Sequence, residues 1–151
     1  MEIKDLAAVC KFCAYQDRSR KEIETKLQSL AIPETEWEAA FAYLIQEKYF
    51  DEQRFVEGFV RGKFRMKQWG RKKILHEIRQ HGISSEKAYA AMESEITEEM
   101  YVETLKQLIQ RKQNELRKEK GEEAKAKIIR YLLQKGYESE DIYAALREVL
   151  A

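Results

Sequence analysis

The chain has 151 residues, close to the commonest length of a single domain and long enough to bury a substantial core. Lys and Arg number 28 against 27 Asp and Glu, a net charge of +1, and a hydrophobic fraction of 44% excludes a wholly disordered chain. One Pro and six Gly are too few for the chain reversals of a many-stranded sandwich or barrel. The composition therefore predicts an all-α protein.

The sequence carries no sign of a membrane span or a secretory signal. No stretch reaches the roughly 20 apolar residues that a span requires, and the first residues lack a signal-peptide pattern. Two cysteines are also too few for a secreted disulfide framework. We therefore expect a cytoplasmic protein that does not contact a membrane.

Capping residues and hydrophobic periodicity predict helices along the whole chain. Ser19 begins an S-x-x-E capping box ahead of a helix, and Pro33 suits the first turn of the next helix. Asp51 is placed to cap a third helix, and Thr97 to cap a long, highly charged helix running toward Gly121.

The helical pattern repeats. Segments 19–32, 70–83 and 124–137 align with offsets of 51 and 54 residues, and each predicts a middle helix followed by a turn. The aligned core and turn positions are Ile23, Ile74 and Ile128; Leu27, Ile78 and Leu132; Ala31, Gly82 and Gly136.

This alignment predicts three three-helix repeats, with bounds at residues 1–49, 50–96 and 97–151. A unit of this size has a small core, so it gains stability from its neighbours. We therefore predict an elongated or curved tandem array, which presents long surfaces to large partners.

Cys10 and Cys13 form a C-x-x-C pair, a spacing shared by zinc sites and redox pairs. The two histidines, His76 and His81, lie more than sixty residues further on, and the chain has no second Cys pair. We interpret the cysteines as small apolar residues on one helix face and the histidines as part of a solvated basic face. Metal or redox chemistry stays open as the alternative, but we expect no metal and no cofactor.

Catalytic motifs are missing from the sequence. It holds no G-x-S-x-G, no Gly-rich phosphate loop and no Cys with a His close by in sequence. The many carboxylates lie at helix-surface spacings, where pairing with Lys or Arg explains them. The sequence therefore predicts a protein that is not an enzyme.

The charge distribution is uneven. Residues 61–81 hold 8 basic groups and 1 acidic group, a net charge of +7, whereas residues 1–60 and 82–151 are net acidic. Such a block attracts phosphate backbones or an acidic protein groove, although a solvated helix face stays open as the simpler interpretation. Its members, with Phe64 and Trp69 interleaved, are Arg61, Lys63, Arg65, Lys67, Arg71, Lys72, Lys73 and Arg79.

Gly58 and Gly62 lie four residues apart on the helix that leads the second repeat. A glycine inside a helix costs about 1 kcal/mol relative to alanine. We therefore predict that another backbone packs closely against these two positions.

The stretch 49–83, YFDEQRFVEGFVRGKFRMKQWGRKKILHEIRQHGI, resembles the hallmark segment of the RecX family, bacterial regulatory proteins that modulate the RecA recombinase. The S-R-x-E-I-x-x-K-L of the first repeat and the threefold repeat extend this resemblance over the whole chain. The residues that carry it are Asp51, Arg54, Phe55, Phe59, Arg61, Gly70, Arg71, Ile74, Ile78, Gly82 and Ile83.

The resemblance implies a binder that lodges in the helical groove of the RecA filament on DNA. It implies inhibition of strand exchange and coprotease activity, by blocked filament growth or disassembly, in DNA repair, recombination and the SOS response. We expect a monomer that contacts DNA mainly through the filament. The candidate contact residues are Arg54, Arg61, Lys63, Arg65, Lys67, Trp69, Arg71, Lys72, Lys73 and Arg79.

Two other classes of function stay open at this point. A helical-repeat protein could bind nucleic acid directly, with Trp69 stacking on an exposed base. A scaffold for some other protein is the third class. Direct, salt-dependent DNA binding without a recombinase would favour the nucleic-acid binder.

Overall fold

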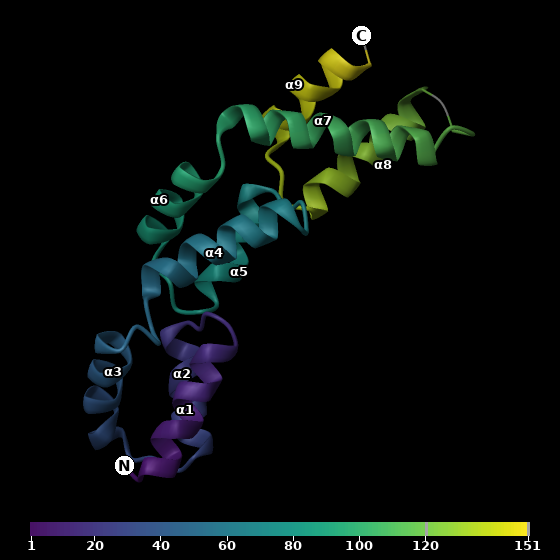
Figure 1. Cartoon of the computed structure of the whole chain (residues 1–151). Helices are drawn as coiled ribbons and strands as arrows, with labels where there is room; N and C mark the ends of the chain where they lie inside the picture. The colour runs from purple at the N-terminus through teal and green to yellow at the C-terminus, as the bar shows by residue number, and fades with distance from the viewer. Residues whose placement is uncertain (120, 151) are drawn as a thin grey trace.

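A computed structural model describes residues 1–119 and 121–150, which form nine α-helices, one 3-10 helix and no strand (Figure 1). The all-α prediction is confirmed. In chain order the elements are α1 (Ile3–Tyr15), α2 (Arg20–Ser29), η1 (Glu34–Glu36), α3 (Trp37–Gln46), α4 (Glu52–Arg65), α5 (Arg71–Arg79), α6 (Ser85–Glu95), α7 (Glu98–Glu115), α8 (Gly121–Gln134) and α9 (Ser139–Val149).

The helices form three successive groups along an elongated array (Figure 1). We call α1–α3 the first repeat, α4–α6 the second repeat and α7–α9 the third repeat. The predicted tandem array of three-helix repeats is confirmed. The exact bounds of the three units stay a prediction.

Side-chain caps begin the helices where the sequence places them. The Ser19 hydroxyl accepts a hydrogen bond from the N–H of Glu22, and the Glu22 carboxylate accepts one from the N–H of Ser19, which completes the capping box. Asp51 and Thr97 each accept a hydrogen bond of 3.1 Å from the N–H three residues further on, at the starts of α4 and α7.

Two helix boundaries differ from the prediction. Pro33 precedes the 3-10 turn of η1, and α3 begins at Trp37, whose indole N–H donates to the carbonyl of Ile32 at 3.0 Å and fixes that start. The long helix α7 ends at Glu115, well before Gly121, which has a φ of +69° and begins α8.

The middle helices of the three repeats end in the same turn. Ala31, Gly82 and Gly136 follow α2, α5 and α8 with φ values of +57°, +79° and +99°. This left-handed conformation is accessible to glycine at little cost, which accounts for the glycine in two of the three turns. The register of the sequence repeat is therefore confirmed by the backbone.

The buried apolar side chains form two separate clusters. One cluster lies within the first repeat, from Val9 to Phe50, and the other runs from Phe55 to Leu146 through the second and third repeats. The first repeat therefore has its own core, whereas the second and third repeats share one.

The closest backbone contact links the second and third repeats. The N–H of Gly70 donates to the carbonyl of Lys135 at 2.7 Å, and the N–H of Lys72 donates to the carbonyl of Gly136 at 3.0 Å. A Cβ on Gly70 would lie 2.4 Å from the Gly136 carbonyl carbon, and a Cβ on Gly136 would lie 2.4 Å from the Cβ of Lys73. Only glycine fits at either position.

The predicted close backbone contact at Gly58 and Gly62 is wrong. A Cβ on Gly62 would meet nothing within 4 Å, and one on Gly58 would meet only side chains, at 4.0 Å. Both glycines lie away from the buried face of α4, which is formed by Val56, Val60 and their neighbours.

The division of the core predicts different outcomes for the same substitution in two repeats. Ile23→Asp should unfold the first repeat alone, because an unpaired buried carboxylate costs several kcal/mol and Ile23 lies in the smaller cluster. Ile74→Asp, at the equivalent position, should unfold the second and third repeats together. Hydrogen exchange read by mass spectrometry measures both, and loss of protection in every helix of Ile23→Asp would contradict the division.

The glycine contact yields a matched pair of variants. Gly82→Ala should lower the free energy of unfolding by about 1 kcal/mol, since its positive φ is strained for alanine but the added Cβ meets nothing within 4 Å. Gly136→Ala should lower it by about 3 kcal/mol or more, because strain and a clash with Lys73 add. Urea unfolding tests this, and equal losses in the two variants would show that the repeats are not in close contact at Gly136.

Candidate functional site

The candidate contact residues lie on α4, the loop that follows it and α5, all in the second repeat (Figure 1). Half of them are exposed, namely Arg54, Arg65, Lys67, Lys72 and Arg79. The half-buried members are Arg61, Lys63, Trp69, Arg71 and Lys73.

Arg54 contacts the first repeat. Its Nε lies 2.7 Å from Oδ1 of Asp17, and its Nη1 donates to the carbonyl of Lys48 at 3.3 Å. Arg61 forms a longer ion pair within the second repeat, 3.8 Å from Nε to Oε2 of Glu95. These two arginines are thus engaged within the protein.

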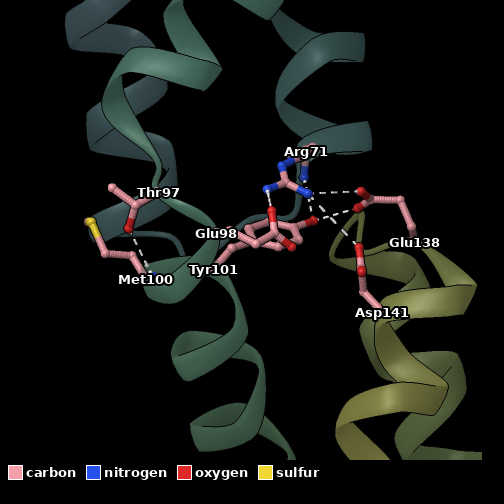
Figure 2. A network of polar contacts seen from close by, with 7 residues as sticks. All are labelled: Arg71, Thr97, Glu98, Met100, Tyr101, Glu138 and Asp141. Carbon is pink, nitrogen blue, oxygen red and sulfur yellow. Dashed lines mark hydrogen bonds and ion pairs between the residues drawn. The ribbon is translucent and has the colours of Figure 1, made fainter.

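Arg71 lies where the second and third repeats meet, against the starts of α7 and α9 (Figure 2). Its Nη2 lies 2.7 Å from Oε2 of Glu98, and its Nη1 lies 3.4 Å from Oε2 of Glu138 and 4.0 Å from Oδ2 of Asp141. The guanidinium therefore ties the start of α5 to two helices of the third repeat.

Tyr101 completes this network (Figure 2). Its ring is fully buried, and the Cζ atom of Arg71 lies 3.8 Å from the ring centroid. The Tyr101 hydroxyl accepts from the N–H of Arg71 at 3.0 Å and donates to Oε1 of Glu138 at 2.5 Å. Burial, and then the hydrogen bond to Glu138, raise the pKa of Tyr101, so the hydroxyl keeps its proton and both bonds.

Sequence reasoning missed this network because the partners of Arg71 all lie in the third repeat. The sequence signal that could have found these partners is the pair of acidic residues in the first turn of α7 and of α9. Carboxylates are stabilised near helix N-termini, where they are also placed to pair with an arginine. A contact of Arg71 with a partner protein stays a prediction.

Trp69 is half-buried against the larger core cluster. The ammonium groups of Lys63 and Lys73 lie 5.0 and 4.6 Å from its ring, within the range of cation–π interactions. The indole thus organises two lysines of the basic block as well as packing against the core.

The loop that carries Lys67 and Trp69 is held by the third repeat. Lys135 Nζ donates to the carbonyl of Lys67 at 3.1 Å, and the Tyr137 hydroxyl donates to the carbonyl of Gln68 at 2.9 Å. Gln68 itself has a φ of +56°. These bonds hold the loop against the third repeat.

Two cations of the third repeat therefore join the candidate site. Arg111 Nη1 donates to Oε1 of Gln68 at 3.2 Å, and Lys135 directly precedes Gly136, whose backbone packs against Lys73. Burial, and then the nearby charges of Lys73 and Arg111, lower the pKa of Lys135. The sequence signal for Lys135 was its position directly before Gly136, the aligned turn glycine. No sequence signal pointed to Arg111.

Arg54, Arg61 and Arg71 pair with carboxylates, as described above. Among residues 1–119 and 121–150, none of the other eight cations of the candidate site forms an ion pair within the protein. We call this set the basic surface: Lys63, Arg65, Lys67, Lys72, Lys73, Arg79, Arg111 and Lys135.

Two family models match the chain. The one described as "RecX, second three-helix domain" matches residues 51–92, and the one described as "RecX, third three-helix domain" matches residues 98–146. The chain belongs to the RecX family. The matched segments hold the candidate residues of the second repeat and the cations that the third repeat adds.

Two curated relatives are named "Regulatory protein RecX". The one from Oceanobacillus iheyensis is 29% identical over 138 residues, which are 91% of this chain and 50% of the relative. The one from Serratia proteamaculans is 34% identical over 112 residues, which are 74% of this chain and 64% of the relative. The chain thus spans between half and two thirds of the length of these relatives.

Solved RecX structures share the fold. The crystal structure of RecX from Lactobacillus salivarius matches with a TM-score of 0.87 and 27% identity, over 97% of this chain and 94% of the other. A second crystal structure, described as regulatory protein RecX, matches with a TM-score of 0.82 over 97% of this chain and 71% of the other.

The C-x-x-C pair of this RecX protein is packed within the first repeat. Burial raises the pKa of Cys13 to about 11 and also raises the pKa of Cys10, so both thiols stay protonated at neutral pH. His76 is exposed as expected, but His81 is not part of a solvated face, because its ring packs between Phe55 and Phe59 at centroid distances of 5.4 and 5.3 Å.

The described part of the chain contains no group of three or more His, Cys, Asp or Glu side chains placed to hold a metal ion. Within that same part, every helix is too short or too polar to cross a bilayer.

The network around Arg71 makes a prediction for Tyr101→Phe. Loss of the hydroxyl leaves the Arg71 N–H and a Glu138 oxygen without a partner, which should lower the free energy of unfolding by about 1–3 kcal/mol. Tyr143→Phe, at an exposed tyrosine of α9, is the matched control and should change little. Coincident urea unfolding curves for the two variants would exclude a stabilising role for the network.

Proposed function

We propose that this RecX protein binds the RecA filament on DNA and inhibits the recombinase and coprotease activities of RecA, and so regulates DNA repair and recombination. It acts by binding, as a cytoplasmic monomer without enzymatic activity. Membership of the RecX family and the regulatory names of its relatives support this proposal.

The observation that carries the proposal is the basic surface on an elongated array. A surface of one sign without internal partners raises the rate of encounter with an acidic partner, and it retains charges that can pair across an interface. An elongated body can lie along a long groove and contact it over many residues. Once seated in the groove of a filament, such a body blocks growth or promotes disassembly.

Seven of the ten candidate residues fall into two groups in this proposal. Arg54 and Arg71 hold neighbouring repeats together, and Trp69 organises the lysines beside it. The exposed residues that form no internal ion pair in the described part of the chain are then the primary contacts: Arg65, Lys67, Lys72 and Arg79.

The test reverses these four charges. The variant combines Arg65→Glu, Lys67→Glu, Lys72→Glu and Arg79→Glu, which changes the net charge of residues 61–81 from +7 to −1. All four side chains are exposed, so the helix content should be retained. Inhibition of ATP hydrolysis by RecA should then require at least about tenfold more protein, because electrostatic steering and pairing are lost.

The matched control places four Glu residues on exposed positions of the third repeat, at Arg117, Lys118, Arg130 and Arg147. This control should inhibit RecA as the wild type does. Full inhibition by a folded variant of the second repeat would contradict the proposal, and loss of inhibition in the control alone would move the contact to the third repeat.

A further inference from the structure

We propose that the joint between the second and third repeats is a binding site for the phosphate backbone of a nucleic acid, formed by Lys67, Lys73, Arg111 and Lys135. We call these four residues the joint cations. This site gives the chain a direct contact with nucleic acid that needs no recombinase, so it goes beyond the function proposed above.

The four charges come from separate elements and meet around one loop. Lys67 lies in the loop between α4 and α5, Lys73 lies in α5, Arg111 lies in α7 and Lys135 follows α8. The side chains of Arg111 and Lys135 bond to Gln68 and Lys67 of the loop, at 3.2 and 3.1 Å. The cluster therefore exists only when the two repeats are docked.

The cluster is built of like charges without a counter-charge. None of the joint cations forms an ion pair in the described residues, and Lys73 and Arg111 are close enough to Lys135 to lower its pKa. Repulsion of this kind opposes docking, and an anion bound between the cations would relieve it.

Hydrogen bonds between the two repeats hold the backbone of the site in place. The Gly70 N–H bonds to the Lys135 carbonyl at 2.7 Å, and the Tyr137 hydroxyl bonds to the Gln68 carbonyl at 2.9 Å. The backbone that carries Lys67 and Lys135 therefore loses little freedom when an anion binds, which favours affinity.

The surroundings favour a nucleic acid over an acidic protein. Protein interfaces depend on exposed aromatic or large apolar anchors. Here Trp69 lies beneath the ammonium groups of Lys63 and Lys73, and the ring of Tyr131 lies 4.7 Å from the ammonium of Lys112. Met66 is the one large exposed apolar side chain between residues 61 and 81.

A surface of cations that presents no free aromatic ring binds phosphates rather than bases. Every nucleotide carries a phosphate. Arg65 and Arg79, the last residues of α4 and α5, add exposed cations to the second repeat outside the joint. Contacts of this kind read phosphates and not base sequence. Binding should therefore depend strongly on salt and little on base sequence, and Trp69 should not stack on a base.

The experiment measures binding of two fluorescent single strands of equal length, oligothymidylate and a mixed sequence, by anisotropy over a salt series without RecA. Wild-type protein should bind both strands with equal affinity. The double variant Arg111→Gln and Lys135→Gln should weaken binding to both about equally and reduce the slope of log K against log salt by about one per residue.

Three controls keep the result interpretable. The pair Lys4→Gln and Lys11→Gln makes the same charge change on exposed α1 and should leave the slope unchanged. Circular dichroism confirms folding, and Lys67→Gln, at an exposed side chain, should lower the slope without disturbing the joint.

An unchanged slope in both folded variants would overturn the proposal, as would an equal loss in the α1 control. Binding of polyglutamate in place of the oligonucleotides would overturn it as well and would assign the surface to an acidic protein. If the wild-type protein does not inhibit RecA but binds oligonucleotides in a salt-dependent way, the proposed function is wrong and the phosphate site at the joint is supported.

Discussion

The architecture of the second and third repeats depends on two peptide hydrogen bonds between the start of α5 and the turn after α8. They form only because Gly70 and Gly136 bring two backbones within a distance that a Cβ on either would prevent. This contact places Arg71 among the carboxylates of α7 and α9, and it places Lys135 beside the loop that carries Lys67. The shared core, and the part of the basic surface that the third repeat supplies, both follow from it.

The contact between the first and second repeats uses the same positions of the repeat but different chemistry. Ser19 stands where the second repeat has Gly70, and its side chain caps α2. The joint is made by side chains: Arg54 to Asp17, Lys21 to the carbonyl of Gln80 at 3.1 Å, and Glu22 facing a histidine. Exposed ion pairs of this kind contribute about 0–1 kcal/mol each, so this joint is the weaker of the two.

The local features of the fold could be predicted from the sequence, because their causes lie within a few residues. The caps at Ser19, Asp51 and Thr97 and the turns at Gly82 and Gly136 depend on nearby backbone alone. Equivalent core positions could be predicted as well, since burial follows the helical period.

The site could be predicted only in part, because its remaining residues depend on how the repeats dock. The cations of α4 and α5 are adjacent in sequence, but Arg111 and Lys135 reach them only through tertiary contact. The same limit explains the error at Gly58 and Gly62, since helical glycines do not reveal which neighbour passes by. It also explains why the partners of Arg71 were missed.

Because the joint between the first and second repeats is weaker than the joint between the second and third, the molecule consists of two structural units rather than three. The second and third repeats form one body with a common core, and the first repeat is attached to it by a few polar side chains. On a partner whose subunits recur at regular intervals, two linked bodies would act as a bivalent ligand. Its avidity would be set by the effective concentration of the second body after the first has bound. On such a partner the internal contacts of Arg54 and Lys21 would set this avidity by setting the stiffness of the joint. A stiffer joint would raise the avidity for one subunit spacing and remove it for all others.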